Sequence, residues 1–409
     1  MNKLNVLLVT DSSHREIYAI ARTLSSRDIP FTMITSIVFQ RNSFFNKFLV
    51  FFLPRGLKDL LNERSIELGS KHSGLVKVSV STFLLTKFLN KLPNRIRGSY
   101  WISLIHRLDT AILYKYTETA NSEQHRVDFT HVVYLTGIQI SKEKDFTKFI
   151  EIAYHGNIEQ ELFWREIAVN LYPQWSNTWN IRDVNYATRF TNEISRIPTH
   201  KKIYASSFNA QFGENKSLNV CVPIGAVKKG AYEANLKLGD FKLLHVGNLG
   251  LRKGIPIILE VAPQVKASFI LAGNGTQESI KHIKSAKIPN VHLQENPSNF
   301  EIIQLMRSSH AFILPSFYEG FGIAILEAMS FGCIPIVSRN TCGIDIVKNS
   351  ELENFLISPG DKSSLEKAIN ELMKLTVSEK LFLANQAVQI SSEFTFEKYG
   401  NAVVNEILS

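Results

Sequence analysis

Residues 311–338 read AFILPSFYEGFGIAILEAMSFGCIPIVS, and this stretch gives the clearest indication of the fold in the sequence. It begins with an apolar, strand-like run that breaks at Pro315 and Ser316. A Tyr-Glu-Gly-Phe-Gly loop follows, and a helix is predicted from about residue 323 to 331, where Gly332 ends it. The apolar residues 334–338 predict the next strand, so the stretch reads as strand, loop, helix and strand.

The loop and the helix start suit a ligand rich in hydroxyl groups or negative charge. Gly320 and Gly322 leave the backbone N–H groups at the helix start open to close approach. Glu319 lies in the loop, and Glu327 lies further along the helix. A carboxylate accepts two hydroxyl hydrogen bonds at once, so the pair favours a polyhydroxylated ligand. The alternative is a surface helix with two solvated glutamates.

Similar apolar runs recur along the whole chain between helical patterns. They lie at 5–10, 31–36, 131–135, 202–206, 242–246, 268–272, 311–315 and 334–338. Strands that alternate with helices indicate parallel sheets covered on both faces. Residues 221–235 carry one proline and two glycines with little periodicity, and they separate two such sets. We therefore expect two doubly wound α/β domains with a cleft between them, and ligands at the carboxyl ends of the strands.

Composition narrows the class of protein. The chain has 409 residues, of which 44% are hydrophobic and 20% charged, and its 21 glycines and 13 prolines exclude a disordered or collagen-like chain. Its three cysteines form no CxxC pair, which favours a reducing compartment. No uncharged apolar run approaches the roughly 18 to 20 residues that a membrane span requires, and the apolar run near the first residue is too short for a signal peptide.

Residues 319–327 (EGFGIAILE) resemble the E-x7-E signature of retaining GT-B glycosyltransferases of the family four type, the glycosyl transferases group 1. The flanking LPS, EAM and GCIPIVS pieces match too, and so do 355–361 (FLISPGD) and 394–399 (FTFEKY). The resemblance covers residues 240–400. It implies the GT-B fold, in which two Rossmann-like domains face a central cleft. We expect an acceptor-binding domain at 1–230, a nucleotide-sugar-binding domain at 236–392, and a terminal helix at 393–409 that crosses back.

Residues 244–254 (LHVGNLGLRKG) resemble the family's G-R-L-x-x-x-K-G segment. The resemblance implies that Lys253 binds the donor diphosphate. Asn248 stands where the family has arginine, and Arg252 could supply the missing charge. The alternative for the Arg-Lys pair is a solvated helix start.

Residues 271–275 (LAGNG) resemble the family's G-x-G turn under the nucleotide, with Gly273 in the turn. A dinucleotide fingerprint would need a glycine at 278, where Glu278 stands, so we set the NAD reading aside.

The leaving group determines whether a metal is needed. A departing nucleoside diphosphate develops negative charge that a metal or fixed cations must stabilise. The sequence contains no Asp-x-Asp pattern, and Lys253, Arg252 and the helix start after Glu319 can serve instead. We therefore expect no metal and no cofactor, with a nucleotide-diphosphate sugar as a substrate.

The first half of the chain resembles the family less. Many members have a glycine-rich loop where residues 12–14 read Ser-Ser-His, although small polar residues can still donate to phosphate. Residues 151–164 (EIAYHGNIEQELFW) resemble the segment that brings a histidine near the donor sugar, which would be His155. A structural or surface histidine is the alternative. The expected catalytic residues are Glu319, Lys253 and His155, and the expected donor-binding residues are Asn248, Arg252, Lys253, Gly273, Gly320, Phe321, Gly322 and Glu327.

The positive charge is concentrated near the start of the chain. The whole chain has a net charge of +9, and residues 1–120 hold 17 Lys and Arg against 8 Asp and Glu. Between Arg41 and Arg107 there are 12 basic and 3 acidic residues, interleaved with aromatic residues at helical spacing. This segment, 41–107, favours basic amphipathic helices on an anionic membrane surface, and a core with a solvated charged face is the alternative. No nucleic-acid-binding module accompanies it.

The resemblance implies transfer of a sugar with retention from a nucleotide sugar to a saccharide or lipid-linked saccharide, at the cytoplasmic face of the membrane, in cell-surface polysaccharide or glycolipid synthesis. Glu319 would orient the ring hydroxyls, and Glu327 would hold the ribose. One alternative is a nucleotide-sugar epimerase of related fold. The other is a non-catalytic sugar-nucleotide binder in an assembly complex.

Overall fold

The structure is a computed structural model that describes residues 6–9, 16–35, 39–40, 65–66, 77–78, 131–135, 148–153, 158–179, 201–212, 218–226, 232 and 239–409. The chain divides into two compact units. The first comprises Met1–Ala153, Arg189–Ile203 and Phe396–Ser409, and the second comprises Tyr154–Thr188 and Tyr204–Thr395. These units interleave along the sequence, whereas we expected contiguous domains at 1–230 and 236–392. The functional domain limits stay a prediction.

The first unit contains a sheet whose strands follow the order β5-β2-β1-β6-β7-β8. The pairs from β5 to β7 are parallel. The strands are β1 (Val6–Val9), β2 (Phe31–Thr35), β5 (Lys77–Val78), β6 (His131–Leu135), β7 (Lys148–Ala153) and β8 (Lys201–Tyr204), beside a separate pair, β3 (Phe39–Gln40) and β4 (Ser65–Ile66). The four strands expected from apolar runs in this half are present, and β3, β4, β5 and β7 do not correspond to any such run.

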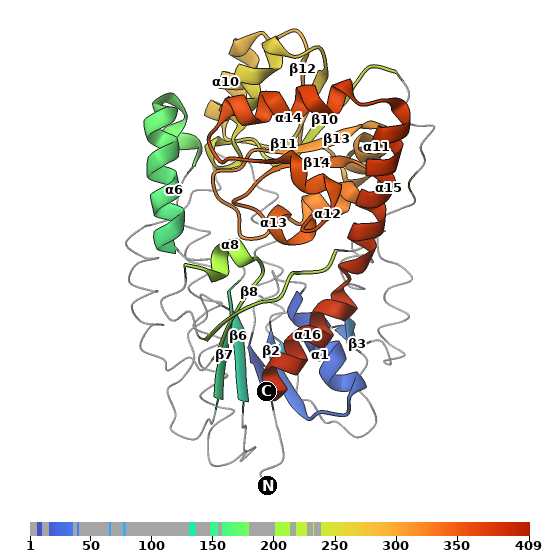
Figure 1. Cartoon of the computed structure of the whole chain (residues 1–409). Coiled ribbons are helices and arrows are strands. Elements are labelled where there is room, and N and C mark those ends of the chain that lie inside the picture. The colour runs from blue at the N-terminus through green and yellow to red at the C-terminus, as the bar shows by residue number, and fades with distance from the viewer. Residues whose placement is uncertain are drawn as a thin grey trace, which may run out of the picture. The chain divides into compact units, whose positions relative to one another are not determined.

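The last helix of the chain lies against the first one (Figure 1). These are α16 (Phe396–Leu408) and α1 (Glu16–Ser26), both in the first unit. A methyl group at Gly400 would overlap the carbonyl of Ala19, so glycine permits this close approach. The Arg27 guanidinium donates to Asn401 Oδ1 at 2.6 Å and to Asn405 Oδ1 at 2.7 Å.

The second unit contains a six-stranded sheet in the order β12-β11-β10-β13-β14-β15, and every adjacent pair is parallel. The strands are β10 (Lys242–Asn248), β11 (Ser268–Asn274), β12 (Val291–Glu295), β13 (Ala311–Leu314), β14 (Ile334–Ser338) and β15 (Leu356–Ile357). The central strands are almost wholly apolar because helices cover both faces of the sheet. The strands expected at 242–246, 268–272, 311–315 and 334–338 are confirmed.

Helices lie on both sides of this sheet, with α14 on one side and α12 on the other (Figure 1). α14 packs against α9, and α12 packs against α15. The helices are α9 (Ile255–Val261), α10 (Gln277–Ala286), α11 (Asn299–Ser308), α12 (Ala324–Met329), α13 (Gly343–Ile346), α14 (Lys362–Lys374) and α15 (Val377–Glu393), with 3-10 turns η5 (Leu251–Lys253), η6 (Ala262–Gln264) and η7 (Glu351–Phe355). The doubly wound α/β class is confirmed.

The second unit also holds segments from the first half of the sequence. They are α6 (Ile158–Leu171), η2 (Pro173–Thr178), α8 (Ser207–Ala210) and β9 (Asn219–Cys221). Among the described residues, no helix has both the length and the apolar character needed to cross a membrane. All three cysteines are free.

Candidate active site

Two loops meet where the direction of winding reverses in the sheet of the second unit. β10 and β13 are neighbours at the centre, and from them the chain proceeds toward opposite edges of the sheet. Ligands of open α/β sheets bind at the carboxyl ends of the strands at such a switch point. Arg252 and Lys253 follow β10, and Glu319 follows β13, so both loops leave the same edge of the sheet.

Backbone contacts join these loops. Phe317 N donates to the carbonyl of Arg252 at 2.9 Å. Gly254 follows Lys253 with a φ of 72°, and a side chain there would overlap the carbonyl of Pro315. Glycine at 254 therefore lets the cationic loop lie directly against the chain that leads to Glu319.

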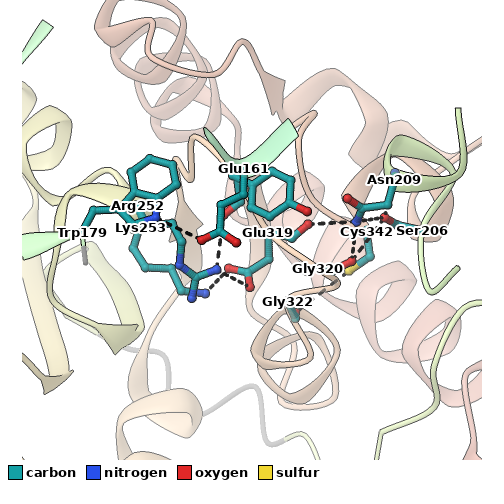
Figure 2. Close-up of polar contacts among 11 residues, drawn as sticks. Glu161, Trp179, Ser206, Asn209, Arg252, Lys253, Glu319, Gly320, Gly322 and Cys342 are labelled. Carbon is teal, nitrogen blue, oxygen red and sulfur yellow. Dashed lines mark hydrogen bonds and ion pairs between the residues drawn. The ribbon is translucent and has the colours of Figure 1, made fainter. Parts of the chain in front are cut away.

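The carboxylate of Glu319 lies between two cations (Figure 2). Glu319 Oε2 forms an ion pair with Lys253 Nζ, and Oε1 forms one with Arg252 Nη1 at 3.2 Å. Lys253 is 9% exposed and Glu319 is 7% exposed. Arg252 Nη1 also donates to the carbonyl of Tyr318 at 3.4 Å. This cluster of three side chains carries one negative and two positive charges, and the nearby Glu161 carboxylate also acts on Arg252.

The charges of Glu319, Lys253 and Arg252 shift one another's pKa values. Burial raises the pKa of Glu319, but the charges of Lys253 and Arg252 outweigh burial and lower that pKa to about 2. Burial lowers the pKa of Lys253, and the Glu319 carboxylate opposes that effect. The Glu319 charge raises the pKa of Arg252. Glu319 is therefore ionised at neutral pH and can accept hydroxyl hydrogen bonds.

The glycine turn expected under a nucleotide joins two strand ends. Gly273 lies opposite Gly247 in the pairing of β11 with β10, and a side chain at Gly273 would overlap the carbonyl of Gly247. Asn248, the last residue of β10, is exposed, whereas Arg252 contacts Glu319. Arg252 thus contributes its charge to the cluster.

The E-x7-E loop has the expected order of elements, but its helix is shorter than expected. α12 spans Ala324–Met329 instead of about 323–331, because Ser330 caps it and Gly332, with a φ of 69°, closes the turn after it. Phe321 and Glu327 are buried, and Gly322 has a φ of 93°. A six-residue helix has few aligned peptide dipoles, so its start has little positive potential of its own.

Three of the regions singled out in the sequence lie outside the described residues. They are His155, the glycine-loop equivalent at 12–14 and nearly all of the basic segment 41–107. Within the described part of the chain, no group of three or more His, Cys, Asp or Glu side chains could hold a metal ion.

Some residues of 158–179 contact the loop of Arg252 and Lys253, although sequence reasoning placed them with the acceptor half. Leu251 N, at the start of η5, donates to Thr178 Oγ1 at 2.9 Å. The Glu161 carboxylate accepts from Trp179 Nε1 at 3.1 Å, and its charge raises the pKa of Arg252 after the larger effect of Glu319. Glu161 lies in the family-like segment 151–164 at a position to which the resemblance gave no role, and Thr178 lies in no motif. Both depend on contacts with residues far along the chain.

His245 on β10 is another polar residue that sequence reasoning missed. It is wholly buried, and its Nδ1 lies 3.2 Å from the carbonyl of Ile313, which can only accept. Burial, and then the charge of Lys253, lower the pKa of His245 to about 4. The imidazole is therefore neutral at pH 7, with its proton on Nδ1.

We expect His245 to make the protein acid-labile. Its folded pKa of about 4 lies below 6.5, so between these pH values the unfolded chain binds a proton that the folded chain does not. The free energy of unfolding should fall by up to about 3 kcal/mol as the pH drops from about 6.5 to 4. Urea unfolding of His245→Asn should show a flatter pH dependence, and His292→Asn, at an exposed position on β12, is the control. Equal pH slopes in wild type and His245→Asn would contradict this expectation.

Residues 231–387 match the family described as Glycosyl transferases group 1. A glycogen synthase of Mycobacterium tuberculosis is 23% identical over 185 residues, which are 42% of this chain and 44% of that protein. A galactosyltransferase of Escherichia coli, whose name specifies UDP-Gal and a GlcNAc-diphosphoundecaprenol acceptor, is 27% identical over 37% of this chain and 41% of its own length. The chain thus spans less than half the length of these curated relatives.

Solved structures match along nearly the whole chain. HepE of Anabaena, solved with UDP and glucose, has a TM-score of 0.55 at 16% identity and covers 99% of both chains. Sucrose-phosphate synthase of Thermosynechococcus elongatus has a TM-score of 0.59 at 14% identity and covers 99% of this chain and 98% of its own. At such identities the likeness concerns the fold, and it confirms the GT-B fold.

Proposed function

Because residues 231–387 belong to the glycosyl transferases group 1 family, we propose that this protein is a glycosyltransferase that moves a sugar, with retention, from a nucleotide-diphosphate sugar to a saccharide or lipid-linked saccharide. The observation that carries the proposal is the buried cluster of Lys253, Arg252 and Glu319 at the switch point of the sheet. It offers cations for a diphosphate beside a carboxylate for sugar hydroxyls.

The two cations support the leaving group. As the bond between the anomeric carbon and the diphosphate oxygen breaks, negative charge develops on the β-phosphate. Lys253 and Arg252 stabilise that charge, and a buried site strengthens the attraction because it is poorly screened. The cations thus take the part that a metal ion has in other sugar transferases, and the proposed reaction needs none.

The transfer proceeds on one face of the sugar. The acceptor hydroxyl attacks the anomeric carbon from the side of the departing diphosphate, and its proton passes to the leaving phosphate oxygen. Glu319 orients the ring hydroxyls without becoming a covalent nucleophile. Glu327 holds the nucleotide ribose, and His155 bonds a sugar hydroxyl or orients the acceptor.

The class of donor and acceptor follows from the relatives' names. HepE was solved in complex with UDP and glucose, and the Escherichia coli relative is named for a UDP-sugar donor and a lipid-linked acceptor. We propose the same classes here, in cell-surface polysaccharide or glycolipid synthesis in the cytoplasm. A nucleotide-sugar epimerase of related fold would convert the donor without an acceptor, and a non-catalytic binder would leave the donor intact.

A donor screen tests the function. We expect one nucleotide sugar to raise the melting temperature of the protein and to undergo slow hydrolysis with retention, in EDTA as well as without it. Product analysis separates the candidates, since an epimerised nucleotide sugar would identify the epimerase. An intact donor with every acceptor would favour the binder. Complete loss of turnover in EDTA that only Mg²⁺ or Mn²⁺ restores would refute metal independence.

We also propose that the basic segment 41–107 binds an anionic membrane surface. Its support is the excess of 12 basic over 3 acidic residues with interleaved aromatic side chains. Replacing several of its Lys and Arg by Gln should weaken co-sedimentation with anionic liposomes, each charge contributing about 1 kcal/mol. Donor affinity should stay unchanged. Equal liposome binding by the substituted protein would rule out this surface.

A further inference from the structure

Two buried side chains hold the backbone of the loop that carries Glu319. They are Ser206, the N-cap of α8, and Asn209 within that helix, which are 0% and 1% exposed. Asn209 Nδ2 donates to the carbonyl of Glu319 at 3.1 Å and to that of Gly320 at 2.7 Å. Ser206 Oγ donates to the carbonyl of Gly320 at 3.3 Å. Figure 2 shows both side chains on the opposite side of Glu319 from Lys253 and Arg252.

The hydrogen bonds determine the orientation of the Asn209 amide. A flipped amide would set Oδ1 against two carbonyl oxygens, which cannot donate. Ser206 Oγ directs its own proton to Gly320 and lies 2.8 Å from Asn209 Nδ2, whose two protons are shared among Ser206 Oγ and the two carbonyls. In this orientation Asn209 Oδ1 is buried without a hydrogen-bond partner among the described residues.

The loop is held at three consecutive carbonyls. Asn209 binds those of Glu319 and Gly320, and Cys342 N donates to that of Phe321 at 3.0 Å. The two anchors are themselves joined, because Ser207 N on α8 donates to Asp345 Oδ2 on α13 at 2.9 Å. α8 and α13 thus form one frame around the loop. Glycines within the loop give its backbone conformational freedom, so contacts with residues outside the loop are needed to fix its conformation.

From these contacts we propose that Ser206 and Asn209 are positioning residues for Glu319. By fixing the carbonyls of Glu319 and Gly320, one on each side of the Gly320 Cα, they set the direction in which the Glu319 carboxylate leaves the backbone. That direction determines whether the carboxylate meets Lys253 and Arg252 and can reach a sugar hydroxyl. The inference deepens the proposed function and rests on it for the identity of the ligand.

The first test compares turnover with nucleotide affinity. Asn209→Ala should lower kcat on the order of 10- to 100-fold, because a small misplacement of a catalytic group has a large effect on rate. The dissociation constant for the nucleoside diphosphate should change by less than about twofold, since Lys253 and Arg252 stay in place. Ser206→Ala should have a smaller effect on kcat, and Ser206→Thr, which keeps the hydroxyl, should restore it.

A matched control separates positioning from general loss of stability. Asn219 Nδ2 donates to the carbonyl of Ala210 at the end of α8, at 2.9 Å. Asn219→Ala should therefore lower the melting temperature while kcat stays near wild type. A loss of kcat in Asn219→Ala equal to that in Asn209→Ala would make the role of Asn209 merely structural.

A double variant tests whether Asn209 acts through Glu319. In a Glu319→Gln background, Asn209→Ala should have little further effect on kcat, because the carboxylate it positions is gone. The shifts in urea midpoint should also fail to add. The same fractional loss of kcat in both backgrounds, with additive midpoints, would overturn the proposal. Non-additive midpoints in a protein that turns over no nucleotide sugar would refute the proposed function and leave the positioning role intact.

Discussion

Glu319→Gln should lower kcat on the order of 100-fold or more while the protein still binds a nucleoside diphosphate. The carboxylate lies between Lys253 and Arg252, and its pKa of about 2 keeps it ionised. Glutamine has the same shape but only one strong acceptor, so the ring hydroxyls lose a charged partner in the transition state. The two cations keep their access to phosphate, so steady-state kinetics should show a loss in kcat with little rise in KM for the donor.

Glu319→Gln should also lower the free energy of unfolding. Removing one partner of a buried ion pair commonly destabilises a protein by about 3–5 kcal/mol, because the remaining charge stays buried. Glu327→Gln is the companion variant, and we expect it to raise the KM for the donor more than it lowers kcat. Unchanged kinetics in both variants would remove Glu319 and Glu327 from the site.

Lys253→Met should abolish most donor use and lower kcat/KM on the order of 100- to 1000-fold. Its ammonium is buried against Glu319, so its charge acts on a bound diphosphate with little screening. Methionine preserves much of the apolar stem and removes only the charge. Calorimetric titration with the nucleoside diphosphate should show the affinity falling with the rate, unlike in Glu319→Gln.

Two further variants help to interpret the effect of Lys253→Met on donor use. Arg252→Met removes a cation that is more exposed, with a side chain 30% accessible, so its effect should be smaller. Combining Lys253→Met with Glu319→Gln removes both buried charges, so the double variant should be less destabilised than the two single changes predict together. Diphosphate affinity unchanged in Lys253→Met would contradict a role in donor binding.

The sequence predicted the sheet of the second unit well because its strands are continuous apolar runs bounded by glycine and proline. The runs at 242–246 and 311–315 became β10 and β13. It predicted the first unit less completely, since β7 (Lys148–Ala153) carries Lys148 and Glu151 within its six residues and has no such run. Helix length was also overestimated for α12, because a cap at Ser330 ended it before the glycine at 332.

The candidate site was predictable in part for the same local reason. Lys253 and Glu319 stand in short motifs, so each was found from its own neighbours in the sequence. Glu161 and His245 lie within the family-like segments 151–164 and 244–254, but at positions to which the resemblance assigns no role, and Asn209 lies in no motif. The importance of all three arises from partners 68 or more residues away.

By itself, the sequence determined the class of fold, the order of elements around residues 311–338 and the identity of the charged residues, because these depend on periodicity and short-range spacing. Two contacts are apparent only in the three-dimensional structure. Lys253 and Arg252 share the carboxylate of Glu319, and Asn209 binds the backbone of the loop that carries Glu319. Parallel pairing of β10 with β13 brings together residues that are 66 and 67 positions apart, and burial then makes their charges act on one another.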